Sequence, residues 1–278
     1  VADNTAVGFN SLLLFTGSNA TAVGSNAATT LSSGTRAVAV GKDALRYSDD
    51  GNNNTALGYA ALGAANCADD NTAVGQFALN AFTGSDATAV GSGAADVAGG
   101  QLNLTAVGKN ALGVATSGNH NTAVGAQSLQ TVNGAQNTAV GNNALAADCV
   151  SNNTGVGYDV LSAYTASAAT AVGSGAAALA TVGDPTAVGY SALGVMTDGT
   201  ENVGLGLYSF GNQLQGGHHN TGAGAYSGWK TSGNRNTILG NRAGIYASTI
   251  DDCIAIGKEA LAGTSTAAVT GNFNVAIG

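Results

Sequence analysis

The sequence predicts an all-β fold, a parallel β-solenoid of about 17 coils with a 16–17-residue repeat. Three observations indicate this fold. A glycine recurs at that period, the residues before it are small or β-branched, and charged residues make up only 9% of the chain. A two-layer helical repeat needs more than about 30 residues, whereas one turn of a β-solenoid needs about 15 to 20. We expect one repetitive domain over residues 1–278 and interpret the chain as a fragment of a longer protein.

The recurring glycine fixes the period of the repeat. "NTAVG" occurs at residues 71–75, 121–125 and 137–141, and "NTALG" occurs at 54–58. The glycine follows a strand and comes shortly before the next segment, so we expect a positive φ or a tight bend, which costs least without a Cβ. The glycines taken as structural repeat positions are Gly8, Gly24, Gly41, Gly58, Gly75, Gly125 and Gly141.

The residues just before the glycine predict a short strand. The position before it is Val in most copies and never polar, the next is nearly always Ala or Gly, and the third is Thr, Val or Ile. β-branched residues favour strands, and the small residue indicates close packing. An "AL" segment such as residues 61–62 follows the glycine, so we expect two or three short strands per coil and a variable polar loop.

An asparagine commonly precedes the strand. Side chains stacked at this turn can hydrogen-bond to one another and to the backbone of successive coils. The asparagines taken as structural repeat positions are Asn54, Asn71, Asn121 and Asn137.

The two faces of the strand predict association of identical chains. Thr and Val share one face, Ala and Asn share the other, and almost no copy carries a charge on either. A strand that is apolar or small on both faces is buried on both, one against its own coil and one against something else. We expect the Thr and Val face to turn inward, and cyclic association of copies to cover the remaining face.

Several segments resemble repeats of known fibrous proteins. "NVAIG" at 274–278, "CIAIG" at 253–257 and "AVAVG" at 37–41 resemble the YadA-like head repeats of trimeric autotransporter adhesins. "PTAVGYSAL" at 185–193 and "NTALGYAAL" at 54–62 resemble NTAVG-type repeats of phage and virus tail-fibre proteins. The resemblance implies a left-handed roll and a homotrimer. The period here is longer than that of the adhesin heads, and the general rule for β crossovers favours right-handed connections.

Charge and composition restrict the partners. The formal net charge is −8 and only eight Lys and Arg are present, which argues against nucleic acid and anionic membranes. No apolar run approaches the roughly 18 residues of a membrane span, so we expect no membrane insertion. The spacing of Cys67, Cys149 and Cys253 fits no metal site, and their role stays open. We expect no cofactor.

Histidines and acidic pairs are candidates for metal binding, with solvated loop positions as the simpler interpretation. His120 and His219 both lie five residues before a repeat glycine. The acidic pairs are Asp49 and Asp50, Asp69 and Asp70, and Asp251 and Asp252.

The position after the glycine varies freely and is sometimes aromatic. Tyr59, Tyr158 and Tyr190 stand there, and such side chains suit contact with a host surface glycan or protein receptor as well as simple exposure.

These features predict a non-enzymatic structural protein. The first expectation is the shaft of a virion tail fibre that presents or contributes to host-receptor attachment. The first alternative is the head of a trimeric bacterial surface adhesin, and the second is an ice-binding solenoid with an exposed Thr ladder. The corresponding locations are the virion, the cell surface or the extracellular space.

Overall fold

The computed structural model describes residues 3–48, 50–63, 67–100, 102–115, 117–212 and 216–278. The described chain is an all-β parallel solenoid of about 15 turns with a repeat of about 17 residues and no helix, which confirms the predicted fold class. The number of turns is slightly lower than the 17 coils expected from the recurring glycines. By its contacts the chain divides into two units, residues 1–137 and 138–278.

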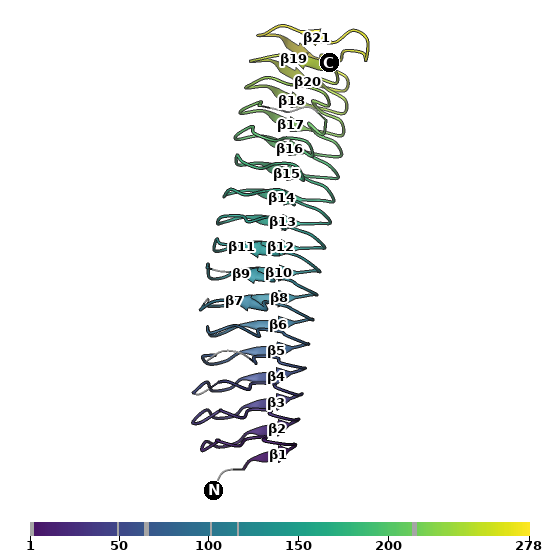
Figure 1. Cartoon of the computed structure of the whole chain (residues 1–278). Helices are drawn as coiled ribbons and strands as arrows, with labels where there is room; N and C mark the ends of the chain where they lie inside the picture. Colours follow the sequence, from purple (N-terminus) through teal and green to yellow (C-terminus); the bar gives the residue numbers. More distant parts are fainter. Residues whose placement is uncertain (1–2, 49, 64–66, 101, 116, 213–215) are drawn as a thin grey trace. The chain divides into compact units, whose positions relative to one another are not determined.

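In the first unit, parallel strands of two or three residues stack in register (Figure 1). The strands are β1 Thr5–Val7, β2 Thr21–Val23, β3 Val38–Val40, β4 Thr55–Leu57, β5 Thr72–Val74, β6 Thr88–Val90, β7 Val97–Ala98, β8 Thr105–Val107, β9 Val114–Ala115, β10 Thr122–Val124 and β11 Thr131–Val132. The ladder runs β1, β2, β3, β4, β5, β6, β8, β10, while β7, β9 and β11 form a second sheet.

The second unit repeats this arrangement. Its strands are β12 Thr138–Val140, β13 Thr154–Val156, β14 Thr170–Val172, β15 Thr186–Val188, β16 Val203–Leu205, β17 Thr221–Ala223, β18 Thr237–Leu239, β19 Ala247–Thr249, β20 Ile254–Ile256, β21 Val269–Thr270 and β22 Val275–Ile277. The main ladder pairs all of them in chain order except β19 and β21, which pair with each other.

The core is a narrow seam between the strand and the turn that follows it. Alanines at the strand centre, such as Ala56 and Ala187, have no exposed surface, and leucines of the opposite turn, such as Leu62 and Leu193, are 1% exposed or less. The seam leaves little room for a larger residue. A Cβ added to Gly204, which takes the alanine position in β16, would lie 3.0 Å from Cγ of Leu193.

The expected orientation of the strand faces is therefore wrong. Thr21, Thr88 and Val23 are exposed, whereas Ala22 and Ala89 are fully buried. The interior is filled by a leucine from the opposite wall, so it accepts only Ala or Gly from the strand, with few exceptions. The Thr and Val side chains consequently point out of the coil.

The expected second strand is also placed differently. The "AL" segments, including residues 44–45 and 61–62, lie in turns, and the described second strands occur only as β7, β9, β11, β19 and β21. Residues with positive and negative φ alternate in the turn, because Asp43 has φ 59° and Leu45 has φ 50° whereas Ala44 between them has no positive φ. The N–H groups of Asp43 and Leu45 donate in opposite directions, to the carbonyl of Ser25 at 2.9 Å and to that of Ala61 at 2.9 Å. The turn is thus hydrogen-bonded to both neighbouring coils without being a strand.

Candidate binding surfaces

The repeat glycines stack backbone against backbone. Gly8, Gly24, Gly41, Gly58, Gly75, Gly125 and Gly141 have φ between 131° and 138°. A Cβ on Gly58 would lie 2.5 Å from the carbonyl oxygen of Gly75 in the next coil. Both the backbone angle and the space therefore require glycine at this position.

The predicted asparagines lie in the interior of the first unit. Asn54, Asn71, Asn121 and Asn137 have no exposed surface. Oδ1 of Asn54 accepts from the N–H of Asn71 at 2.9 Å, and Nδ2 of Asn54 donates to the carbonyl of Ala68 at 2.9 Å. Each asparagine of this kind links a strand to a loop and to the next coil, so its buried polar atoms are paired.

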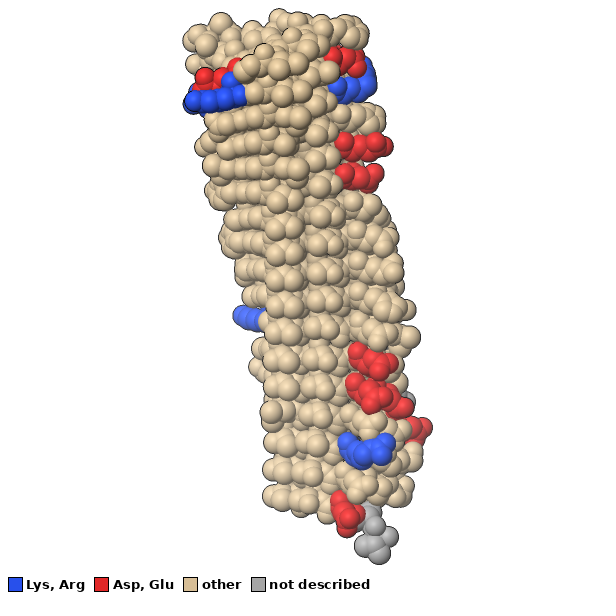
Figure 2. Space-filling model, turned by 180° about the vertical axis from the view of Figure 1, so that it is seen from behind, with Lys and Arg blue, Asp and Glu red and all other residues tan. Residues whose placement is uncertain are grey.

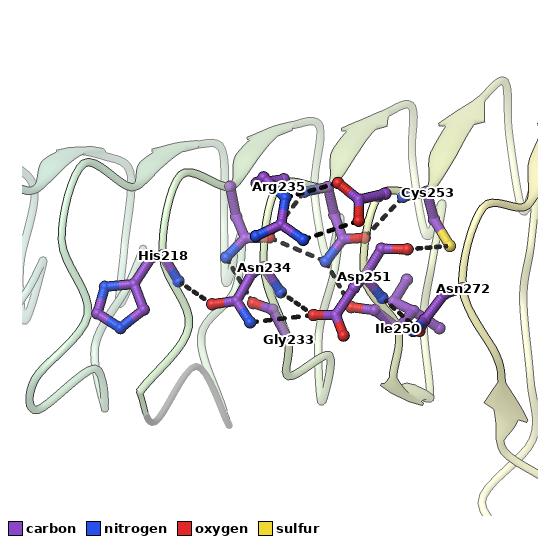
Figure 3. A network of polar contacts seen from close by, with 11 residues as sticks. His218, Gly233, Asn234, Arg235, Ile250, Asp251, Cys253 and Asn272 are labelled. Atoms are coloured by element: carbon purple, nitrogen blue, oxygen red, sulfur yellow. Dashed lines mark hydrogen bonds and ion pairs between the residues drawn. The ribbon is translucent and has the colours of Figure 1, made fainter.

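A second polar column lies beside the asparagines, and Figure 3 shows it in the second unit. Oδ1 of Asp251 accepts from both the backbone N and Nδ2 of Asn234, at 2.7 and 3.0 Å, while Oδ1 of Asn234 accepts from the N–H of His218 at 3.0 Å. Arg235 donates two hydrogen bonds to Asp252, at 2.6 and 2.8 Å, and this hydrogen bonding lowers the pKa of the Asp252 carboxyl. These side chains hold coils together.

The histidines and acidic pairs form no metal centre in the part of the chain that the structure describes. Nε2 of His219 lies 3.6 Å from Glu201, and Nε2 of His120 lies 3.5 Å from Nδ2 of Asn103. Asp69 and Asp70 accept hydrogen bonds from Asn52 and Asn53 of the preceding coil. Asp50 accepts one from Ser33, and Asp49 lies outside the described residues. Cys67, Cys149 and Cys253 are free and buried.

The outward strand face of each unit carries exposed apolar side chains. The residue before the glycine is 36% to 46% exposed at Val23, Leu57, Val90, Val107 and Val124 in the first unit. In the second unit it is 37% to 41% exposed at Val140, Val172, Val188, Leu205 and Ile256. Because the strands pair in register, these side chains form a row of Val, Leu and Ile beside a row of Thr. In Figure 2, many turns of each unit carry no charged residue on the side that is shown.

The three predicted receptor-contact tyrosines are exposed but do not form one site. Tyr59 is 42% exposed and contacts Phe77 edge-on, with ring centroids 5.2 Å apart. Tyr158 is 58% exposed. Tyr190 is 51% exposed and contacts Tyr208 edge-on, also at 5.2 Å. A hydrogen bond with Tyr190 raises the pKa of the Tyr208 phenol.

An aromatic cluster in the second unit was not predicted from the sequence. Its members are Tyr190, Tyr208, Tyr226, Trp229 and Tyr246, which follow one another in ring contacts with centroids 5.2 to 6.2 Å apart. The signal in the sequence is the spacing of 18 residues from Tyr190 to Tyr208 and from Tyr208 to Tyr226. Tyr190 stands one place after its glycine, whereas Tyr208 and Tyr226 stand two places after theirs.

A pocket of about 240 Å³ lies beside this cluster. It is lined by Tyr226, Trp229, Asn241, Arg242 and Ile245. These residues come from the turns that follow β17 and β18, and none belongs to a strand.

Comparison with protein-family models, with curated proteins and with solved structures found no match for this chain. No helix among the described residues is suited to crossing a bilayer.

Proposed function

We propose that this chain is a non-enzymatic structural fibre segment, the shaft of a virion tail fibre, which assembles as a parallel, left-handed homotrimer and supports attachment to a host receptor. The observation that carries the proposal is the outward row of Val, Leu and Ile on the strands of each unit. Exposed apolar side chains in a continuous array mark an interaction surface. A second and third copy, each with the same row, cover it by closed rotational symmetry. The repeat resemblance supports the trimer, the handedness and the fibre role.

The head of a trimeric bacterial surface adhesin is the alternative that the same surface supports. It uses the same trimer and differs in what the chain is attached to. The sequence that flanks this chain in its full-length protein distinguishes the two, because an adhesin carries a membrane-anchoring β-barrel and a fibre carries a virion-attachment or chaperone domain.

The experiment is a measurement of mass in solution by light scattering. We expect three copies of the 26.7 kDa chain. Val107→Glu and Val188→Glu each place three carboxylates against one another in the trimer, so both variants should shift the mass toward that of the single chain. Tyr158→Ser, which changes an exposed side chain outside the strands, is the matched control and should leave the trimer intact. A folded wild-type chain that stays monomeric at high concentration contradicts the proposal.

Ice binding is a second candidate, because the structure places the Thr row on the outside rather than the inside. Thr122 and Thr138 belong to rows in which neighbouring strands lie about 4.8 Å apart, so hydroxyl and methyl groups repeat regularly. If the chain is monomeric, this surface contacts water. Thermal hysteresis that is lost on Thr122→Lys and Thr138→Lys, and kept in Tyr158→Ser, would then favour ice binding over the fibre.

A further inference from the structure

The aromatic cluster of the second unit contains a tryptophan that packs between two aromatic neighbours. Trp229 is half-buried between two edge-on neighbours, Tyr226 at 6.2 Å and Tyr246 at 5.4 Å between ring centroids. Nζ of Lys230 lies 4.9 Å from the centroid of Trp229 and 5.3 Å from that of Tyr246. The N–H of Tyr246 donates to the carbonyl of Trp229 at 3.0 Å, so two coils support the ring together.

The pocket beside Trp229 combines an apolar base with polar groups at its margin. Ile245 is 6% exposed and forms the apolar base, and Tyr226 and Trp229 add aromatic walls. Asn241 and Arg242 are exposed and supply amide and guanidinium groups. This is the usual composition of a small-molecule site, an apolar lining with a few polar groups that set orientation.

The polar groups keep capacity for a ligand. Nε of Arg242 approaches Glu259 only to 3.6 Å, well beyond the 2.7–2.9 Å of a charge-assisted hydrogen bond. Nδ2 of Asn241 donates to the carbonyl of Ala225 at a long 3.4 Å, and its Oδ1 is an acceptor. In the part of the chain that the structure describes, no closer contact occupies the Arg242 side chain.

The size and chemistry of the pocket favour a single sugar ring. Its volume of about 240 Å³ is below the roughly 300–1,000 Å³ of sites for drug-sized ligands, so it suits one ring. A pyranose has a C–H face that packs on an aromatic ring and hydroxyls that bond to amide and guanidinium groups. A dinucleotide is too large, and the acidic chain does not favour a polyanion.

We propose that Tyr226, Trp229, Asn241, Arg242 and Ile245 form a binding site for a pyranose unit of a surface glycan. The inference deepens the attachment role and rests on the proposed function for its setting. The ring stacks on the aromatic wall, and the hydroxyls, or a carboxylate in an acidic sugar, bond to Asn241 and Arg242. The site lies on the turns, and none of its residues belongs to the strand face that the proposed trimer covers.

The experiment follows the fluorescence of Trp229, which is the single tryptophan of the chain and therefore reports on this pocket alone. The full chain is titrated with methyl β-galactopyranoside, methyl α-mannopyranoside and N-acetylneuraminic acid, and with sorbitol as an open-chain control. We expect a saturable change with a Kd of about 1–10 mM for at least one pyranose, a range ordinary for a single small ring, and none with sorbitol. Tighter binding of the acidic sugar than of the neutral ones assigns a carboxylate to Arg242.

Two variants test the site without straining the fold. Tyr226 and Arg242 have φ of 58°, a conformation that asparagine tolerates, and Asn143 occupies the equivalent place with the same φ. Tyr226→Asn and Arg242→Asn should each weaken binding at least tenfold, while Gln127→Asn, made at the same place after the glycine with the same φ of 58° but outside the pocket, should not alter it. The inference is overturned if no pyranose saturates below about 100 mM, if sorbitol gives the same change, or if both variants bind like the unaltered chain.

Light scattering on the same samples separates this inference from the fibre proposal. Sugar binding by a monomer supports the pocket and contradicts the fibre. A trimer whose tryptophan does not respond to any pyranose contradicts the pocket and leaves the fibre standing.

Discussion

The residues of the narrow core compensate for one another in volume. Where the usual leucine is replaced by Phe210, the strand position opposite is Gly222, whose added Cβ would lie 2.5 Å from Cε2 of Phe210. Where the usual alanine is replaced by Ile238, the turn position is Gly244, whose added Cβ would lie 2.8 Å from Cδ1 of Ile238. Both exchanges pair a larger side chain with a glycine, which avoids overpacking of a close-packed interior.

Gly222→Ala should destabilise the fold by about 1–3 kcal/mol, because the new methyl overlaps the ring of Phe210. The double variant Gly222→Ala with Phe210→Leu restores the combination found in other coils and should recover most of the loss. Urea unfolding of the two single variants and the double variant measures the coupling. Additive effects of the two substitutions would contradict the compensation.

Burial of Cys149 makes stability depend on alkaline pH. The side chain has no exposed surface, and this burial raises the pKa of its thiol from 9.0 to about 11. Below pH 9 the folded and unfolded chains both hold the proton. Between pH 9 and 11 only the unfolded chain releases it, so stability is lost as pH rises, by on the order of 2 kcal/mol. Unfolding of the wild type and Cys149→Ala across this range should show a steeper loss for the wild type, and equal slopes would contradict it.

The sequence predicted close packing at the alanine position of the strand. It did not predict that this position points into the coil. The alternation of a strand places Ala opposite to Thr and Val, and either face can be the inner one. The choice depends on which residues fill the opposite wall, here the leucines of a turn, and that turn was expected to be a strand. Side-chain hydrophobicity gave the wrong prediction, because the more apolar Val points outward and the smaller Ala points inward.

The turn after the glycine is the element least visible in the sequence. It places residues with positive φ two and four places after the glycine, including bulky ones such as Leu62 and Phe77. Such angles usually indicate Gly, Asn or Asp, and only some coils have these residues there. Hydrogen bonds to both neighbouring coils and burial of the leucine offset the backbone strain. Local residue propensities do not include these contacts between coils, so they could not predict the turn.

Ala60 and Ala61 test the strain in this turn. Ala60 has φ 52°, so Ala60→Gly should relieve strain and raise stability by up to about 1 kcal/mol. Ala61 is fully buried without a positive φ, so Ala61→Gly should lower stability by about 1 kcal/mol through lost packing and greater freedom of the unfolded chain. Thermal unfolding compares the two variants, and effects of the same sign would show that the turn is not strained.

On the scale of a whole unit, each coil contacts only its neighbours, so damage should stay local. Asn71→Ala removes the acceptor of the Ala87 N–H and the donor to the Gly84 carbonyl. Buried groups left unpaired cost about 1–3 kcal/mol each. We expect amide hydrogen exchange to rise in the coils around residues 67–88 and to stay unchanged around β2. Uniform loss of protection across the first unit would contradict a nearest-neighbour fold.

The repeat period, together with the small and β-branched residues before each glycine, predicted the solenoid. The candidate pocket could not be predicted in the same way. Its five lining residues come from two successive turns and do not recur as a set in the other coils. A search for residues that repeat with the period therefore does not find them. Spacing of aromatic residues by one coil length is the feature to search for in related chains.

The in-register stacking of equivalent backbones has a consequence for how such a gene changes. Excising or copying the residues between two equivalent glycines joins conformations that are already the same, so a protein of this design alters its length in whole steps of about 4.8 Å. Recombination between near-identical stretches such as "NTAVG" at 71–75 and 121–125 keeps every column aligned. Whole coils can therefore be gained or lost during evolution while the fold stays the same.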